Sequence, residues 1–158
     1  MSSTLIKNGK VISSTGVIAH DVLIDGETIR ALGAPGYFTE EGVDRVIDAA
    51  GKYVIPGGVD VHTHMELPFG GTFASDTFET GSNAAAWGGT TTIIDMAVQR
   101  YGENVHEGLA EWHRKADGNC SIDYSFHQIV GGVDDQSLKD IKYLVALDRI
   151  SSYKLFLD

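Results

Sequence analysis

The sequence predicts an α/β fold in which a short β-rich segment precedes strands that alternate with helices. Residues 1–54 consist of brief apolar runs separated by turn signals. From Val59 onward, apolar runs alternate with longer amphipathic segments, and strand starts recur roughly every thirty residues. That spacing is typical of parallel strands joined by helical crossovers. We therefore expect two parts, residues 1–54 and residues 55–158.

Composition limits the possible partners. The 158 residues carry 22 acidic and 12 basic side chains, a formal net charge of -10, which argues against binding to nucleic acid or to an anionic membrane surface. No apolar run is long enough for a membrane span, and the first residues do not have the pattern of a signal peptide. Cys120 is the only cysteine, so no internal disulfide can form. These features favour a cytoplasmic protein with no membrane and no nucleic-acid partner.

The β-rich segment contains two hairpin signals. Asn8-Gly9 and Asp25-Gly26 each lie between apolar runs, as in two-residue turns. A loop over residues 34–44 and a last apolar stretch follow. We expect a small antiparallel sheet without chemistry of its own.

The second part reads as four strands and three helices. Asp76 with Glu79, and Asn104 with Glu107, are spaced like helix-capping pairs, while Gly88-Gly89 and Gly118 are stop signals. The expected strands are 59–64, 90–97, 121–130 and 150–157, and the expected helices are 75–89, 104–119 and 134–147.

This pattern suits either a doubly wound sheet or a (β/α)8 barrel. No glycine-rich phosphate-binding motif follows the first strand. Instead, polar side chains lie near the strand ends, where barrel enzymes build their sites: His62, His64, Asp95, His127 and Lys154. This favours a TIM-type (β/α)8 barrel. Four strands are present, about half of a complete one.

His62 and His64 are the first candidate site. Side chains two residues apart on a strand share a face, with Cα atoms about 6.5 Å apart, so the two imidazoles could chelate one metal ion. Asp60 has the same parity and should share that face. Two unrelated polar residues at a strand end would give the same pattern.

Lys154 is the second unusual residue, because it lies in an apolar strand. Its stem could pack while its ammonium group reaches water. Alternatively, desolvation and nearby positive charge could keep the amine neutral. A neutral amine can react with carbon dioxide to form a carbamate, an anion able to bridge two metal ions.

Longer stretches give a specific resemblance. "PGGVDVHTHMELPFGGTFASDTFETGSNAAAWGGTTTIIDMAVQ", then "CSIDYSFHQIV" and "SSYKLFL", resemble the N-terminal portion of the dihydropyrimidinase/D-hydantoinase family of cyclic amidohydrolases. The resemblance implies a small β-sandwich segment followed by the first four βα units of the barrel.

The resemblance also implies a site with two divalent metal ions, usually zinc. The positions that match metal ligands are His62, His64 and Lys154, the last carbamylated by carbon dioxide. The loop after the histidines would be a substrate loop, with Met65, Leu67 and Phe69 facing the substrate; ordinary packing of these side chains is the alternative. His127 is expected to be packed or hydrogen-bonded rather than a ligand.

The implied reaction is hydrolysis of a cyclic amide, a dihydropyrimidine or a 5-substituted hydantoin, to an N-carbamoyl amino acid. The family's catalytic aspartate and remaining ligands would lie beyond Asp158, so this chain is expected to hold no catalytic residue and to be inactive alone. After Lys154, Leu157 and Asp158 depart from the family's usual Phe-Met-Ala-Tyr pattern. The parent is expected to be a homotetramer or dimer. Allantoinase, dihydroorotase or a non-catalytic scaffold of the same fold remain alternatives.

Overall fold

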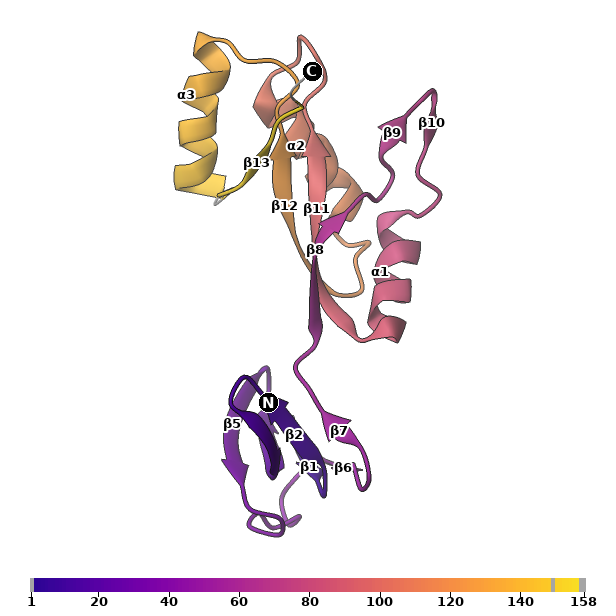
Figure 1. Cartoon of the computed structure of the whole chain (residues 1–158), viewed down its shortest axis with the longest axis vertical. Coiled ribbons are helices and arrows are strands. Elements are labelled where there is room, and N and C mark those ends of the chain that lie inside the picture. Colours follow the sequence, from indigo (N-terminus) through magenta and orange to yellow (C-terminus); the bar gives the residue numbers. More distant parts are fainter. Residues whose placement is uncertain (1, 149, 157–158) are drawn as a thin grey trace. The chain divides into compact units, whose positions relative to one another are not determined.

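The computed structural model describes residues 2–148 and 150–156. The chain divides into two compact units, residues 1–56 and 57–158. Leu157 and Asp158, where the sequence departs from the expected family pattern, lie outside the described residues. Each unit is described by itself below (Figure 1).

The first unit contains two small sheets, and the unit's buried side chains include Leu5, Val11, Val22 and Ala49. One sheet has the strand order β5-β4-β1-β6 and the other the order β3-β2-β7. The strands are β1 (Ser3–Lys7), β2 (Lys10–Ser13), β3 (Gly16–Ala19), β4 (Asp21–Asp25), β5 (Thr28–Gly33), β6 (Arg45–Asp48) and β7 (Tyr53–Val54). The pairs β1–β6 and β2–β7 are parallel and the others antiparallel, so the expected small antiparallel sheet is instead two mixed sheets.

The two hairpin predictions have different outcomes. Asp25 and Thr28 close an antiparallel hairpin between β4 and β5, with Gly26 in the left-handed region at φ 59°, so this hairpin is confirmed. Asn8-Gly9 does not form one, because β1 and β2 belong to different sheets. Asn8 instead donates through its side chain to Asp48 at 2.9 Å and turns the chain from one sheet to the other.

The second unit is built on a parallel sheet with the strand order β13-β12-β11-β8. A separate two-stranded hairpin, β9 and β10, follows the first strand. The elements are β8 (Gly58–Thr63), β9 (Pro68–Phe69), β10 (Thr72–Phe73), α1 (Phe78–Gly88), β11 (Thr90–Val98), α2 (Val105–Ala116), β12 (Asp123–Ile129), α3 (Asp135–Tyr143), a π-helical turn (Leu144–Asp148) and β13 (Tyr153–Lys154).

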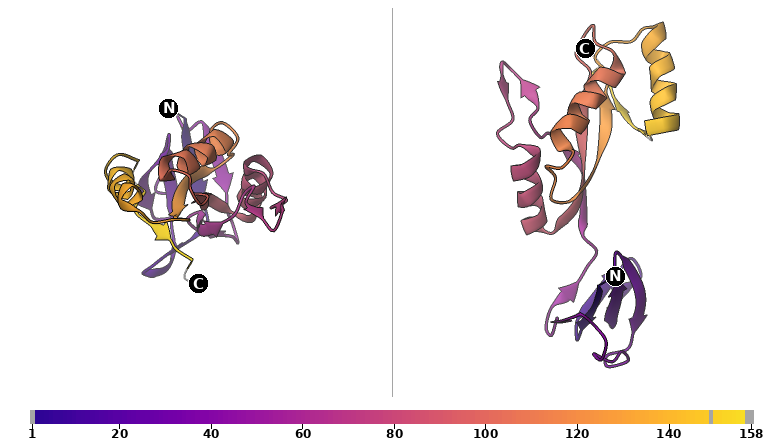
Figure 2. Two further views of the ribbon diagram at one scale, coloured as in Figure 1. Left: turned by 90° about the horizontal axis from the view of Figure 1, so that it is seen from above. Right: turned by 180° about the vertical axis from the view of Figure 1, so that it is seen from behind.

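The strand order decides between the two architectures that the sequence left open. Each new strand adds beside the previous one, without the reversal that defines a doubly wound sheet. The three helices lie along one side of the strands, as seen from above in Figure 2. This is the arrangement of part of a (β/α)8 barrel wall, so the prediction of an incomplete barrel is confirmed.

The helix starts confirm one capping prediction and correct the other. Asn104 caps α2, and Glu107 completes the capping box, as expected. At α1 the cap is Thr77, paired with Thr80, rather than Asp76 with Glu79. The hydroxyl of Thr80 reaches back to the backbone N–H of Thr77 at 3.0 Å, and therefore takes the place expected for an acidic side chain.

The two faces of the parallel sheet have different roles. The face toward the helices carries the core, in which Ala97 and Phe126 pack with side chains of α1 and α2, among them Phe78, Leu109 and Trp112. The opposite face carries the alternate positions, including Met96, Val98, His127, Ile129 and Lys154. In a complete barrel this second face is the interior, and we call it the inner face.

Substitution by alanine should have different effects on stability at two helical glycines. A Cβ on Gly108 would lie 2.4 Å from the carbonyl oxygen of Val98, because α2 crosses the end of β11 closely there. Gly108→Ala should therefore lower the free energy of unfolding by about 1–3 kcal/mol. Gly88→Ala meets nothing within 4 Å and should leave stability unchanged or slightly raised. Tryptophan fluorescence during urea unfolding measures this, since Trp87 and Trp112 both lie in the second unit.

Candidate functional site

The buried carboxylate of Asp95 holds the histidine-bearing strand in place. Asp95 lies on β11 and is fully buried on the face toward the helices. Its Oδ2 accepts hydrogen bonds from the hydroxyl of Thr63 at 2.7 Å and from the backbone N–H of Met65 at 2.8 Å. Its Oδ1 accepts from the indole N–H of Trp112 at 2.9 Å. These donors account for the burial of the carboxylate, which would otherwise be costly.

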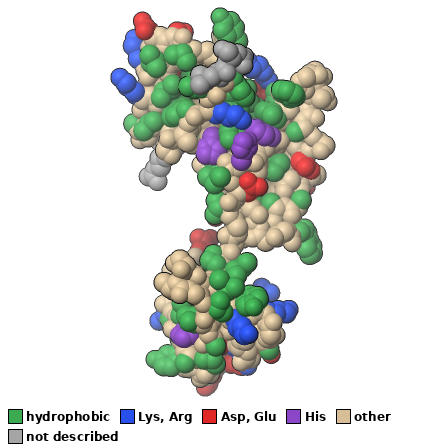
Figure 3. Space-filling view, viewed as in Figure 1, with side chains coloured by type: hydrophobic (Ala, Val, Ile, Leu, Met, Phe, Trp, Pro, Cys, Tyr) green, Lys and Arg blue, Asp and Glu red, His purple; other side chains and the backbone are tan. Residues whose placement is uncertain are grey.

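The anchor on Thr63 determines where its neighbours point. Because successive side chains on a strand lie on opposite faces, fixing Thr63 toward the helices directs His62 and His64 toward the inner face. The Nε2 atoms of the two imidazoles are 3.2 Å apart. Figure 3 shows histidine side chains gathered on one face of the second unit. The structure therefore brings the predicted pair together.

A β-bulge in β8 modifies the simple alternation expected from the sequence. Val61 and His62 lie opposite a single residue of β11, so one extra residue enters β8. Before the bulge, Asp60 pairs with Ile93 and shares its face. The expectation that Asp60 lies on the same face as His62 and His64 is therefore wrong, because the extra residue changes the parity.

Side chains satisfy the backbone groups that the bulge displaces. The backbone N–H of His62 donates to Oδ1 of Asp60 at 3.0 Å. The carbonyl oxygen of Val61 accepts from Nε2 of His127 at 2.8 Å. The other ring nitrogen of His127 contacts the hydroxyl of Ser152, so His127 is hydrogen-bonded at both nitrogens. Satisfied backbone groups allow an irregular strand to persist in a packed structure.

Lys154 lies at the end of β13 and lines the same pocket as His64. The pocket, about 420 Å³, is lined by His64, Leu67, Pro68, Phe69, Val98, Ile129, Lys154 and Phe156. The ammonium group of Lys154 lies 5.2 Å from the centre of the Phe156 ring. Among the described residues Lys154 forms no salt bridge. Its charge is therefore not neutralised by a carboxylate of the described chain.

The electrostatics keep His64 neutral. Burial lowers the pKa of its imidazole, and the positive charge of Lys154 and the neighbouring His62 lower it further, against an opposing effect of Asp95. Its Nδ1 is buried and forms no hydrogen bond with any of the described residues. A neutral imidazole is the form that binds metal ions. By contrast, burial raises the pKa of Cys120 to about 11, so this thiol is not a nucleophile at neutral pH.

The candidate substrate-loop residues separate into two groups. Leu67 and Phe69 line the pocket beside His64 and Lys154, and Phe69 is 80% exposed. Leu67 also packs against the core. Met65 packs against the core as well but does not line this pocket; it lies beneath α1, where a Cβ on Gly81 would lie 2.2 Å from its sulfur. The structure thus places Met65 under the loop and the other two on its pocket side.

Within residues 2–148 and 150–156, no three His, Cys, Asp or Glu side chains lie close enough to hold a metal ion together. The set that the structure does assemble is two imidazoles and one amine. Two nitrogens bound to one tetrahedral zinc ion lie about 3.3 Å apart, given Zn–N distances of about 2.05 Å. The 3.2 Å separation of the two Nε2 atoms fits that requirement.

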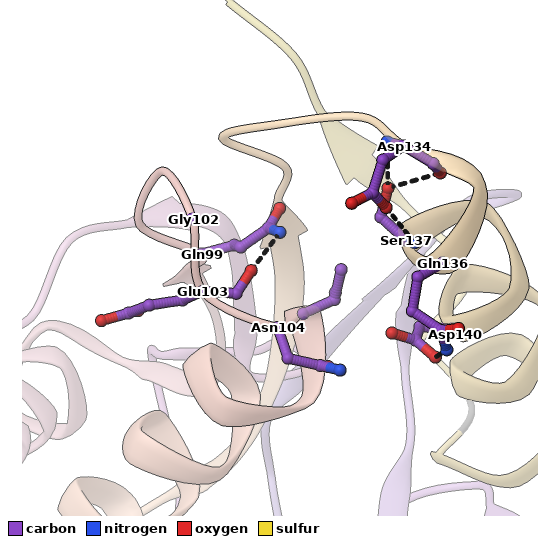
Figure 4. A pocket seen from close by; sticks show the side chains of 9 residues that line it. Gln99, Gly102, Glu103, Asn104, Asp134, Gln136, Ser137 and Asp140 are labelled. Atoms are coloured by element: carbon purple, nitrogen blue, oxygen red, sulfur yellow. Dashed lines mark hydrogen bonds between the residues drawn. The ribbon is translucent and has the colours of Figure 1, made fainter.

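A second pocket, of about 190 Å³, is polar but has no comparable arrangement. It lies between the loop before α2 and the start of α3 (Figure 4). Gln99 donates to the carbonyl of Glu103 at 2.7 Å, and Gln136 donates to Asp140 at 2.8 Å. Because these groups pair within the loop and the helix, we do not regard this pocket as the functional site. No helix in the described part of the chain is long and apolar enough to cross a membrane.

Known proteins are similar to this chain over nearly its whole length. Residues 53–130 match the Amidohydrolase family. D-hydantoinase of Streptomyces coelicolor is 54% identical over 99% of this chain, a match that covers 34% of the relative's own length. Dihydropyrimidinase of Rattus norvegicus is 39% identical over 97% of this chain, a match that covers 30% of that relative's length. The crystal structure of dihydropyrimidinase from Brevibacillus agri superposes with a TM-score of 0.90 at 44% identity, over 96% of this chain and 32% of that one.

The chain belongs to the amidohydrolase family. Within it, sequence and structure both resemble the hydantoinases and dihydropyrimidinases, as the motifs predicted. The chain spans about a third of the length of these relatives.

Asp95 and His127 received no site role from the sequence beyond their place near strand ends. Asp95 follows two isoleucines within an apolar strand, which indicates burial but does not identify its hydrogen-bond partners. The contacts of His127 with Val61 and Ser152 depend on the bulge and on the next strand, neither of which has a sequence signature.

Asp95→Asn should destabilise the second unit by about 2–4 kcal/mol, because an amide nitrogen would face a donor and leave it unpaired in the interior. Asp123→Asn is the matched control, since Asp123 is an exposed carboxylate on the adjacent strand and should change stability by less than about 0.5 kcal/mol. Urea unfolding followed by tryptophan fluorescence measures both. Equal effects of the two substitutions would contradict the anchoring role.

The pKa of His64 should lie below the ordinary histidine value of about 6.5, so that its ring stays neutral to a lower pH. Lys154→Met should raise this pKa, because one source of positive charge is removed, but burial should still hold it below the ordinary value. NMR titration of the histidine ring protons measures both midpoints. A His64 midpoint above that of a denatured-state histidine would be inconsistent with this environment.

Proposed function

We propose that this chain forms part of a metal-dependent hydrolase of cyclic amides, acting on dihydropyrimidines or 5-substituted hydantoins to give N-carbamoyl amino acids. The observation that carries the proposal is the 3.2 Å approach of the His62 and His64 Nε2 atoms, beside a pocket that Lys154 also lines. The names of the similar proteins, D-hydantoinase and dihydropyrimidinase, support the substrate class.

His62 and His64 would hold one of two divalent metal ions, and we propose zinc because histidine nitrogens are common zinc ligands. When bound, the metal ions supply a water of lowered pKa and polarise the amide carbonyl. The lowered pKa of His64 supports this role, because the ring does not have to lose a proton before it binds a cation.

Lys154 would serve as a carbamate. Its neutral amine adds to carbon dioxide, forming a nitrogen–carbon bond and releasing one proton, and the product is an anion with two oxygen donors. The lack of a salt bridge to Lys154 among the described residues leaves its amine accessible to this reaction.

Leu67 and Phe69 would contact the apolar substituent of the substrate. Both line the pocket with His64 and Lys154, and the exposure of Phe69 leaves its ring available for contact. Met65 would act indirectly, because it packs beneath α1 and supports the start of the loop.

A chimera tests the activity. When this chain replaces the matching stretch of the Streptomyces coelicolor D-hydantoinase, zinc-dependent turnover of a 5-substituted hydantoin should be retained. His62→Ala, His64→Ala or Lys154→Ala should each lower turnover by roughly a hundredfold or more, since each removes a ligand. Added short carboxylic acids should partly rescue Lys154→Ala by replacing the carbamate.

His20→Ala, in the first unit, is the control and should have no effect. Full activity of the ligand variants would refute the proposal.

The 158-residue chain by itself should have little hydrolase activity, because it supplies only three of the expected ligands. The measurement is turnover of hydantoin and dihydrouracil by the purified chain with zinc and bicarbonate. Metal-dependent turnover that purifies with a chain of this mass would show that three ligands suffice.

A further inference from the structure

We infer that His127 is a positioning residue that connects the two sides of the candidate metal site. The inference rests on the proposed function, because it concerns how the ligands proposed there are held. One imidazole joins the bulge that carries His62 to the segment that leads into Lys154, and two strands of the sheet lie between β8 and β13.

The first contact lies at the bulge. Nε2 of His127 is 2.8 Å from the carbonyl oxygen of Val61, the residue just before His62. A carbonyl oxygen can only accept, so Nε2 must carry the proton. The bond crosses β11, which lies between β12 and β8, and therefore fixes the irregular part of β8 from the inner face. On the other side of the bulge, Asp60 accepts the N–H of His62 at 3.0 Å.

The second contact lies before β13. Nδ1 of His127 contacts the hydroxyl of Ser152, two residues before Lys154. With Nε2 protonated in a neutral ring, Nδ1 is the acceptor and the hydroxyl of Ser152 donates. The backbone also joins these segments, since the N–H of Gln128 donates to the carbonyl of Ser152 at 3.1 Å.

The two contacts use both nitrogens of His127, so this ring is not itself a ligand. Their combined effect is to set the separation between the His62 side and the Lys154 side of the site. Residues that orient metal ligands without touching the metal typically change metal affinity by about 10–100-fold when they are substituted.

The experiment is a Co²⁺ titration of the 158-residue chain, followed by visible absorption, with variants that remove one contact or both. His127→Phe removes both and should weaken Co²⁺ binding by about tenfold or more. His127→Gln places an amide N–H near the position of Nε2 and should recover part of the affinity. Ser152→Ala should weaken binding in the unsubstituted chain but add little in the His127→Phe background. His113→Phe, on α2, is the matched control and should leave the affinity within twofold.

A second readout needs no metal. Nitrogen-15 NMR of the metal-free chain should report Nε2 of His127 protonated and Nδ1 unprotonated near neutral pH. Urea unfolding of each variant gives its folded fraction, so that a loss of affinity can be separated from a loss of structure.

The outcomes distinguish this inference from the proposed function. If the unsubstituted chain binds Co²⁺ and His62→Ala does not, but His127→Phe binds equally well, the positioning role is overturned and the metal site stands. The opposite tautomer of His127 would also overturn it. If the unsubstituted chain binds Co²⁺ no better than the His62→Ala/His64→Ala pair, the proposed function fails, and this inference fails with it.

Discussion

The arrangement of the site depends on one buried carboxylate. Asp95 accepts three hydrogen bonds, two from the histidine-bearing segment and one from Trp112 of the helix behind the sheet. Loss of any of these donors would leave a buried carboxylate oxygen unsatisfied, which is costly in free energy, and the segment that supplies two of them is therefore held in place. The strand ends that would otherwise be free to fray are thus fastened to the core.

Once Thr63 is held by Asp95, ordinary strand geometry determines where the neighbouring side chains point. Thr63 faces the helices, so the histidines on either side of it face the inner surface. The bulge at Val61 and His62 then adjusts the approach of the two rings, with Asp60 and His127 taking up the backbone groups that it displaces. The positions of the His62 and His64 rings therefore depend on the bulge in β8 as well as on the regular part of the sheet.

The inner face combines apolar walls with a few nitrogen groups, which is a common composition for small-molecule sites. Leu67 and Phe69 reach the pocket from the loop after β8, while Lys154 reaches it from β13. The candidate site is thus assembled from segments about ninety residues apart in sequence, across all four strands of the sheet. Only parallel pairing in chain order brings these segments to one face.

The sequence by itself determined the alternation of strands and helices, the cap at Asn104, the histidine pair and the family resemblance, because these depend on local periodicity and on short motifs. It misplaced the Asn8-Gly9 hairpin, the cap of α1 and the face of Asp60. Each of those depends on a partner that is not encoded nearby: the choice of sheet for β2, the reach of the Thr80 hydroxyl, and one extra residue in β8. The roles of Asp95 and His127 were likewise decided only in the tertiary structure, since a hydrogen-bond partner two strands or a helix away leaves no pattern in the chain.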